Sequence, residues 1–272
     1  MNADALHAHT PNADGDWHDL GKHVESVAEL AETFSEPFGG AAHGRAVGLL
    51  HDLGKANPLF QRYLDLCHRE PDRKHQTLDH KGAGTLAIRG IAPGNQSLVF
   101  AIAGHHGGLQ DKEELGEKLR EWKHKTPPNL SVPGVPAPPD TTELAFPGWV
   151  GKDWANQELF TRLLFSALVD ADALDTERHG TPGASELRTT ERPAISDLAD
   201  RMTAAQHAIA GGSETVVQRV RDELAASCLA AASMPPGLFR LTAPTGSGKT
   251  RSALSFALEH ARHNGLRRVI SV

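Results

Sequence analysis

The stretch Leu49-Leu50-His51-Asp52-Leu53-Gly54-Lys55 places a histidine beside an aspartate near the end of an apolar helical segment. A helix turn can present both side chains to one cavity, where an imidazole nitrogen and a carboxylate oxygen can each bind a metal ion. A His-Asp pair alone occurs by chance, so its meaning depends on the other possible ligands. These follow in order along the chain: His23, then His80, the doublet His105-His106, and the pair Asp170 and Asp172. The ordered series predicts a site for two metal ions.

This series resembles the HD phosphohydrolase superfamily and, more narrowly, the HD nuclease domain of the CRISPR-associated helicase-nuclease of type I systems. The matching segments are His51–Lys55 with Phe60-Gln61, Asp79–Gly84, the His105-His106 doublet and Leu168–Glu177. The resemblance implies an all-helical domain that hydrolyses phosphodiester bonds with bound metal ions.

A second motif, Ala243-Pro244-Thr245-Gly246-Ser247-Gly248-Lys249-Thr250, is a phosphate-binding loop. Gly246 and Gly248 allow the backbone N–H groups to turn toward phosphate. Lys249 is expected to reach the β- and γ-phosphates, and Thr250 to coordinate Mg²⁺. The loop stands where the similar family begins its helicase domain. The sequence therefore predicts nucleotide binding at Gly246–Thr250, with ATP and Mg²⁺ as cofactors of the full-length helicase.

The apolar periodicity predicts a mainly α fold, with an all-helical HD domain over residues 1–193. No strand pattern competes in this part. The expected helices cover 23–34, 46–53, 82–90, 96–103, 111–125 and 158–174, with a Pro-rich extended insertion at 126–140 and a polar loop at 176–193.

A helical connector is expected over residues 194–235, broken at Gly211-Gly212. Residues 236–272 are expected to begin a RecA-like domain, with strands at 237–241 and 267–272 around a helix at 250–263. The acidic strand that would hold Mg²⁺ and the later helicase motifs do not follow. The last segment therefore reads as a truncated RecA-like α/β piece.

The composition is ordinary for a soluble globular protein, with 39% hydrophobic and 23% charged residues. The net charge of −6 gives no global basic field, so any DNA contact must come from a local groove. Two cysteines, no secretory signal and no membrane-spanning stretch predict a cytoplasmic protein, expected to be monomeric. The 16 histidines are unusual, and we expect several of them to be scattered on the surface: His7, His9, His68 and His75.

The resemblance assigns Asp52 as the carboxylate that bridges two metals. His23, His51 and one later aspartate would complete one ligand set, and His80, His105 and His106 the other. On a helix, Asp170 and Asp172 flank the apolar stripe at about equal angles, so geometry does not choose between them. The resemblance favours Asp172, and Asp170 could instead accept a hydrogen bond from a ligand histidine.

Two further expectations concern the chemistry of the site. Lys55 lies one helical turn after His51, where it either binds the scissile phosphate or is a solvated lysine at a helix C-terminus. Imidazole ligands favour Fe, Mn, Co or Ni ions over Mg²⁺.

The function predicted from these features is metal-dependent cleavage of single-stranded DNA. The resemblance implies that an RNA-guided CRISPR surveillance complex exposes the strand, which the full-length protein nicks and degrades while translocating 3′ to 5′. Two alternatives are an HD phosphohydrolase acting on nucleotides and a non-catalytic partner-binding module. An assay of single-stranded DNA against deoxynucleoside triphosphates separates the first alternative, and metal analysis separates the second.

Overall fold

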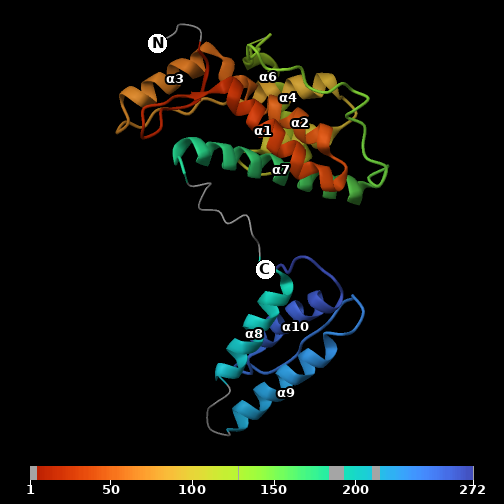
Figure 1. The fold of residues 1–272 in the computed structure, drawn as a ribbon. Helices are drawn as coiled ribbons and strands as arrows, with labels where there is room; N and C mark the ends of the chain where they lie inside the picture. The colour runs from red at the N-terminus through yellow and green to blue at the C-terminus, as the bar shows by residue number, and fades with distance from the viewer. Residues whose placement is uncertain (1–4, 128, 184–192, 210–214, 272) are drawn as a thin grey trace. The chain divides into compact units, whose positions relative to one another are not determined.

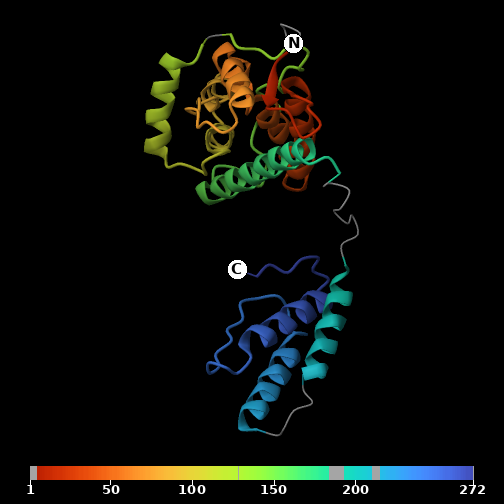
Figure 2. The ribbon, with the colours of Figure 1, turned by 90° about the vertical axis from the view of Figure 1, so that its left-hand side faces the viewer.

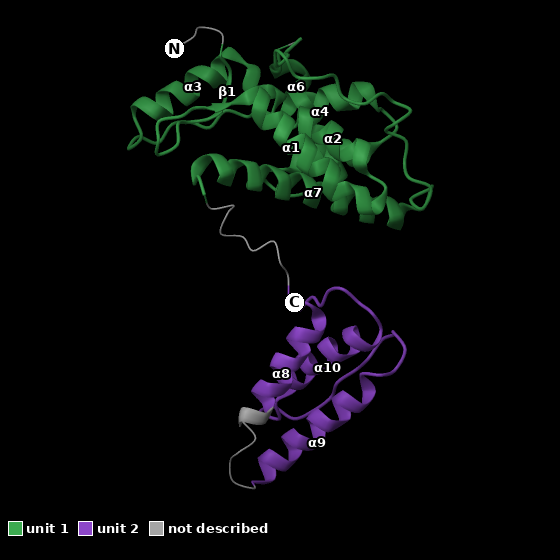
Figure 3. Cartoon of the chain, in the orientation of Figure 1, with its two compact units in different colours: residues 1–188 green, residues 189–272 purple. Residues whose placement is uncertain are grey.

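The structure is a computed structural model that describes residues 5–127, 129–183, 193–209 and 215–271. The chain divides into two compact units, residues 1–188 and 189–272, which are treated separately (Figure 3). Helices dominate both units, as predicted. The domain boundaries at 193 and 235 stay a prediction.

Unit 1 holds seven α-helices in its described part, numbered in chain order in Figure 1. Their bounds are α1 Leu20–Ser35, α2 Ala41–Leu50, α3 Pro58–Arg69, α4 Lys81–Ile91, α5 Gln96–Gly104, α6 Lys112–Lys125 and α7 Trp154–Gly180. Two 3₁₀ turns, η1 Glu36–Phe38 and η2 Leu53–Ala56, follow α1 and α2.

The long helix α7 runs along one side of unit 1 and contacts α1, α2 and α5 (Figures 1 and 2). Its apolar stripe forms the centre of the core, with Phe160, Leu164 and Leu168 fully buried. Burying each such side chain contributes about 1.5–3 kcal/mol relative to exposure. This packing fixes the residues near the end of α7 against α1 and the end of α2.

Two glycines permit the close approaches that shape the centre of unit 1. A Cβ on Gly48 of α2 would collide with the backbone of Ala28 in α1. A Cβ on Gly54 of η2 would collide with the carbonyl of His80. The end of α2 and the start of α4 can therefore lie in backbone contact, which brings His80 beside the His51-Asp52 pair.

The expectation of a strand-free N-terminal part was wrong. Strand β1 (His7–His9) pairs antiparallel with β2 (His18–Asp19), and His9 lies opposite His18. Strands of two and three residues are too short to show a period-two pattern, so the sequence did not reveal them. The hairpin is anchored by Ala8, which is buried in a small cluster with Leu20 and Val24.

Several helix ends differ from the prediction, including the starts of α2 at Ala41 and of α7 at Trp154. The first helix begins at Leu20, before His23, because the side chain of Asp19 caps it by accepting from the backbone N–H of Lys22. Helix α2 ends at Leu50 and η2 follows, so Leu53 lies outside the α-helix. Helix α7 continues to Gly180, so the polar loop expected at 176 begins later; the buried stripe continues through Asp175.

Unit 2 contains α8 Ile195–Ile209, α9 Val216–Ala231 and α10 Lys249–His263, and both α8 and α9 pack on α10. Gly211-Gly212 lies outside the described residues. The strands expected at 237–241 and 267–272 do not form within the described residues, since a strand needs a hydrogen-bonded neighbour and neither segment has one there.

The segment 126–140 has no helix or strand in its described residues, in agreement with an extended insertion. Among the helices of the described ranges, none is at once long enough and apolar enough to cross a membrane.

Candidate metal centre

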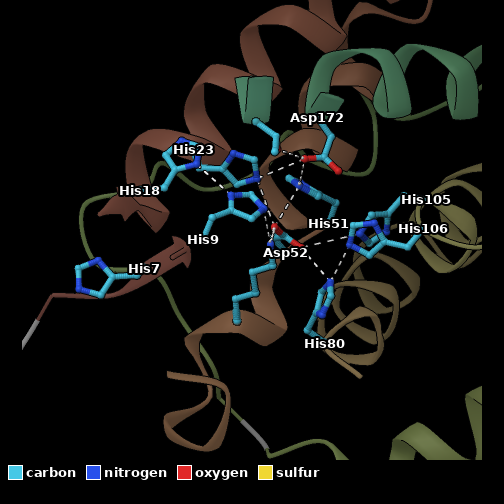
Figure 4. A network of polar contacts seen from close by, with 12 residues as sticks. His7, His9, His18, His23, His51, Asp52, His80, His105, His106 and Asp172 are labelled. Atoms are coloured by element: carbon cyan, nitrogen blue, oxygen red, sulfur yellow. Dashed lines mark hydrogen bonds and ion pairs between the residues drawn. The ribbon is translucent and has the colours of Figure 1, made fainter. Parts of the chain in front are cut away.

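Five segments of unit 1 bring candidate ligands together around Asp52 (Figure 4). His23 of α1 lies on one side of this carboxylate, and the histidines beside α4 and α5 lie on the other. The residues that meet here are His23, His51, Asp52, His80, His105, His106 and Asp172.

Two of the histidines are held in the same way at the ends of helices. His51 follows α2 and its Nδ1 donates to the carbonyl of Gly48 at 2.8 Å. His105 follows α5 and its Nδ1 donates to the carbonyl of Ile102 at 2.7 Å. Because a carbonyl only accepts, the proton lies on Nδ1 of each ring. Nε2 is therefore the nitrogen of each histidine that is left for a metal ion, and it is aimed at Asp52, as in histidine ligands oriented by a backbone oxygen.

The two carboxylate oxygens of Asp52 face two different sets of imidazoles. Oδ2 lies 3.2 Å from Nε2 of His23 and 3.4 Å from Nε2 of His51. Oδ1 lies 3.3 Å from Nε2 of His80 and 3.8 Å from Nε2 of His105. This is the placement expected of a carboxylate shared by two metal ions.

Each set has one further member. Oδ1 of Asp172 lies 3.5 Å from Nε2 of His23 and 3.8 Å from Nε2 of His51. Nε2 of His106 lies 2.9 Å from Nε2 of His80. Asp170, the alternative to Asp172, is exposed on α7. Rotation along α7 thus turns Asp172, and not Asp170, toward α1 and the end of α2.

We call the two sets the inner set, His23, His51, Asp52 and Asp172, and the outer set, Asp52, His80, His105 and His106.

Buried atoms at the centre test whether these residues fit metal ions. Among the buried atoms of the described residues that have no hydrogen-bond partner of good geometry, five lie at this centre: Nε2 of His23, His51 and His105, and both oxygens of Asp52. Each unsatisfied buried polar atom costs about 1–3 kcal/mol. Metal ions would satisfy all five atoms, so the residues present fit metal binding.

Two histidines of the outer set have lowered pKa values, which favours the neutral form that binds metal. Burial, with the opposing attraction of Asp52 too weak to compensate, lowers the pKa of His80 to about 3. Burial and the neighbouring His105 lower the pKa of His106 to about 4. Both rings are therefore neutral at pH 7, and their lone pairs are free to bind a cation.

In the inner set, the pKa shifts of His23 and Asp52 favour the charged forms instead. Burial opposes the charged form of His23, but its hydrogen bond to Asp175 and the nearby carboxylate of Asp52 outweigh it and raise its pKa to about 9. Burial also opposes the charged form of Asp52, yet the nearby charge of Lys55 holds its pKa well below the usual range. In the inner set, an imidazole that favours its charged form therefore lies beside an ionised carboxylate.

Lys55 is not the solvated lysine that one alternative described. Only 3% of the residue is exposed, and Nζ lies 2.7 Å from Oδ2 of Asp52. Lys55 therefore compensates the charge of the central carboxylate inside the site. Its contact with a scissile phosphate stays a prediction.

Three residues at the centre were not identified from the sequence: His9, His18 and Asp175. His9 was expected on the surface, but Nε2 lies 3.3 Å from Nζ of Lys55, and burial followed by the Lys55 charge lowers its pKa to about 3. Only Asp175 left a signal in the sequence, since it continues the buried stripe of α7 four residues after Ala171. Of the other histidines expected on the surface, His68 is exposed, whereas His7 and His75 are half-buried.

In unit 2, Gly246, Ser247 and Gly248 form a loop that leads into α10, whose first two residues are Lys249 and Thr250. Gly246 and Gly248 have φ of 82° and 83°, a conformation that favours glycine. Nζ of Lys249 donates to the carbonyls of Ala243 at 2.8 Å and Pro244 at 3.2 Å. A cavity of about 500 Å³ adjoins the loop and α9, and Ser247, Gly248 and Arg221 line it. Nucleotide binding here stays a prediction.

A protein-family model described as "Cas3, HD domain" matches residues 8–213. The matched region contains every member of the inner and outer sets and ends before the phosphate loop. No curated protein matches the sequence.

Proposed function

The chain belongs to the Cas3 HD domain family, and from this premise we propose that it cleaves single-stranded DNA with two divalent transition metal ions. The family supports the broader description, a metal-dependent HD hydrolase of CRISPR defence with nuclease activity. The kind of DNA, the number of ions and their identity are the proposal.

One observation carries the two-metal proposal: the oxygens of Asp52 face two separate groups of imidazole nitrogens. A site for one ion would need one convergent group of ligands. Here the inner and outer sets share only Asp52, so a single carboxylate would join two coordination sites. The nitrogen-rich ligands favour Fe, Mn, Co or Ni over Mg²⁺.

The described residues divide the work of the proposed reaction. Bound metal ions would supply an activated water and positive charge for the phosphate that is attacked. Asp52 holds the two sites in register, and the backbone carbonyls behind His51 and His105 keep their Nε2 atoms aimed inward. Lys55 keeps Asp52 ionised and adds positive charge beside it.

The exposure of the ligands indicates where a phosphate would enter. His23, His51 and Asp52 are completely buried, whereas His106 is exposed and Asp172 is partly exposed. The strand must therefore approach from the side of His106 and Asp172. A single strand bends into a recessed site more easily than a stiff duplex, which supports single-stranded DNA as the substrate.

The partners and the second activity belong to the same proposal. The phosphate loop supports ATP-driven translocation in a full-length helicase-nuclease, with Gly246–Thr250 holding the phosphates. By the resemblance of the sequence, an RNA-guided surveillance complex would expose the strand to be cut, and degradation would proceed 3′ to 5′.

The test uses chelator-treated protein reloaded with one metal at a time. Labelled single-stranded DNA, duplex DNA and deoxynucleoside triphosphates serve as substrates for the wild type and for Asp52→Asn. We expect metal-dependent cleavage of the single strand by the wild type only. Faster hydrolysis of triphosphates would instead support a nucleotide phosphohydrolase, and absence of both bound metal and hydrolysis would support a partner-binding module.

A further inference from the structure

A closed ring of contacts connects the inner set to the N-terminal hairpin. Oδ2 of Asp52 contacts Lys55 at 2.7 Å and His23 at 3.2 Å. From these two neighbours the ring continues through three residues that no ligand set contains: His9, His18 and Asp175. His9 and His18 lie beside His23 in Figure 4.

One arm of the ring leads from Lys55 to Asp175. Nζ of Lys55 lies 3.3 Å from Nε2 of His9, and Nδ1 of His9 lies 2.9 Å from Nδ1 of His18. Nε2 of His18 then lies 3.1 Å from Oδ2 of Asp175. The other arm is short, because Nδ1 of His23 lies 2.8 Å from the same oxygen of Asp175.

Only one distribution of protons satisfies every contact of the longer arm. An ammonium group only donates, so Nε2 of His9 accepts from Lys55 and the proton of His9 lies on Nδ1. His9 then donates to Nδ1 of His18, whose proton lies on Nε2 and is donated to Asp175. At the end of this arm, Nε2–H of His18 therefore donates to the carboxylate of Asp175.

The same rules for donors and acceptors determine which nitrogen of His23 donates to Asp175. An ionised carboxylate only accepts, so Nδ1 of His23 donates to Asp175 and its lone pair for a metal lies on Nε2. That atom is the one that faces Asp52 and Asp172. Asp175 therefore accepts from His18 and His23 at one oxygen, while its other oxygen lies 3.6 Å from Nη1 of Arg178.

The hairpin that supplies His9 and His18 is held at two places. The ring of His179 on α7 stacks on that of His18, with centroids 4.2 Å apart and an interplanar angle of 11°. The side chain of Gln61 accepts from the backbone N–H of His7 and donates to the carbonyls of His7 and Lys55. The hairpin is thus joined to α7 and to η2, the two elements that carry Asp175 and Lys55.

We propose that Asp175 and His18 are positioning residues that orient His23 as a metal ligand. The hairpin β1–β2 then supports the inner set, because its strand β2 carries His18. The proposal rests on the proposed metal-dependent function and deepens it. Asp175 acts on His23 directly, and His18 acts by holding Asp175. Neither residue belongs to the inner or the outer set.

The test measures metal binding separately from cleavage. Chelator-treated protein is titrated with Co²⁺ by calorimetry, and the visible absorption of Co²⁺ reports the ligands of each ion. Asp175→Ala removes both the charge and the acceptor. We expect it to weaken binding of one of two Co²⁺ ions by roughly 10–100-fold and to change its absorption, with the other ion unaffected.

Two milder variants separate orientation from a general structural role. Asp175→Asn keeps an acceptor oxygen, so we expect part of the affinity and the wild-type spectrum to return. His18→Phe keeps a ring on His179 but cannot donate to Asp175, so we expect a smaller loss than in Asp175→Ala. Glu158→Gln on the same helix is the matched control, because its carboxylate forms only an exposed ion pair with Arg162, and we expect wild-type binding.

The outcomes distinguish the two proposals. Two Co²⁺ ions bound by Asp175→Ala with wild-type affinity and spectrum would overturn the positioning role. Wild-type protein that binds no Co²⁺ would instead overturn the metal-dependent function. If Asp175→Ala does not fold, Asp175→Asn and His18→Phe decide: wild-type binding and spectra in both would refute the proposal.

Discussion

The metal centre of unit 1 and the phosphate loop of unit 2 were both identified from short motifs, but they are built in different ways. At the centre, ligands from five segments converge, and within the described residues the buried atoms Nε2 of His23, His51 and His105 and both oxygens of Asp52 remain without good hydrogen bonds. In the loop, one continuous segment satisfies itself, because Lys249 donates to the carbonyls of Ala243 and Pro244. Buried polar atoms without hydrogen-bond partners indicate that a ligand is missing. A loop whose polar groups bond to each other shows only that the motif has folded.

The strongest way to break this comparison is to remove the group shared by both ligand sets. We expect Asp52→Asn to lose both metal ions and to reduce DNA cleavage to background, because each ion loses a ligand and the bridge. Bound metal, measured by elemental analysis, and cleavage of labelled single-stranded DNA check this. Asp52→Ala should in addition lower the free energy of unfolding by about 3–5 kcal/mol, since it leaves Lys55 buried without its partner. Glu158→Gln is the control, and near wild-type cleavage by Asp52→Asn would refute the shared carboxylate.

The next largest effect concerns the choice of metal. We expect Mn²⁺, Fe²⁺, Co²⁺ or Ni²⁺ to restore cleavage to chelator-treated protein, and Mg²⁺ alone to restore little, because Mg²⁺ prefers oxygen ligands and retains its waters. Initial rates with one metal at a time provide the measurement. Full activity with Mg²⁺ that is insensitive to His105→Ala or His106→Ala would contradict an imidazole-dominated centre.

A sharper test compares two aspartates of α7. We expect Asp172→Asn to weaken binding of the ion in the inner set, because its carboxylate lies 3.5 Å from Nε2 of His23. Asp170→Asn should bind metal as the wild type does, since Asp170 is exposed. Calorimetric titration of both variants measures the difference, and a larger loss in Asp170→Asn would reassign the ligand.

The protonation states of the two ligand sets predict a difference in proton release. His23, with a pKa of about 9, carries a proton at pH 7 and must lose it to bind metal. His80 and His106, with pKa values of about 3 and 4, are neutral and release none. Metal titration at pH 7 in buffers of different ionisation enthalpy should therefore show one proton fewer in His23→Gln than in the wild type. As the pH rises through 9, the wild type should release progressively less from this site, and an unchanged count in His23→Gln would contradict the assignment.

The smallest expected effect is at the phosphate loop. We expect Lys249→Ala to cleave short single-stranded DNA at the wild-type rate, with or without ATP, because Lys249 belongs to unit 2 and to none of the ligand sets. Parallel cleavage assays with and without ATP measure this. ATP-stimulated cleavage that disappears in Lys249→Ala would show that the loop already contributes in this chain.

Sequence patterns predicted those parts of the fold that depend on local periodicity. Apolar spacing located the helices of unit 1 other than α3 (Pro58–Arg69), where no helix was expected. The order of His and Asp residues indicated the segments that converge on Asp52. The hairpin was missed because its strands are two and three residues long. The contact of His9 with Lys55 joins residues far apart in sequence through this hairpin, so no local pattern could reveal it.

Helical periodicity could not choose between Asp170 and Asp172 for a different reason. Both flank the apolar stripe of α7, and only the packing of that helix on α1 and α2 determines which one turns inward. The strands expected at 237–241 and 267–272 failed because pairing, and not composition alone, makes a strand.

The position of α7 along the chain also affects when, during folding, the protein becomes able to bind metal. The inner set draws on α1, on the end of α2 and, last along the chain, on α7, so the set stays incomplete until α7 docks. Closing so long a loop carries an entropic penalty that apolar packing of Phe160, Leu164 and Leu168 must offset before the ligands meet. We therefore expect metal capture to follow helix docking during folding. A nascent chain would emerge from the ribosome without a finished centre, which delays its reactivity until synthesis has passed α7.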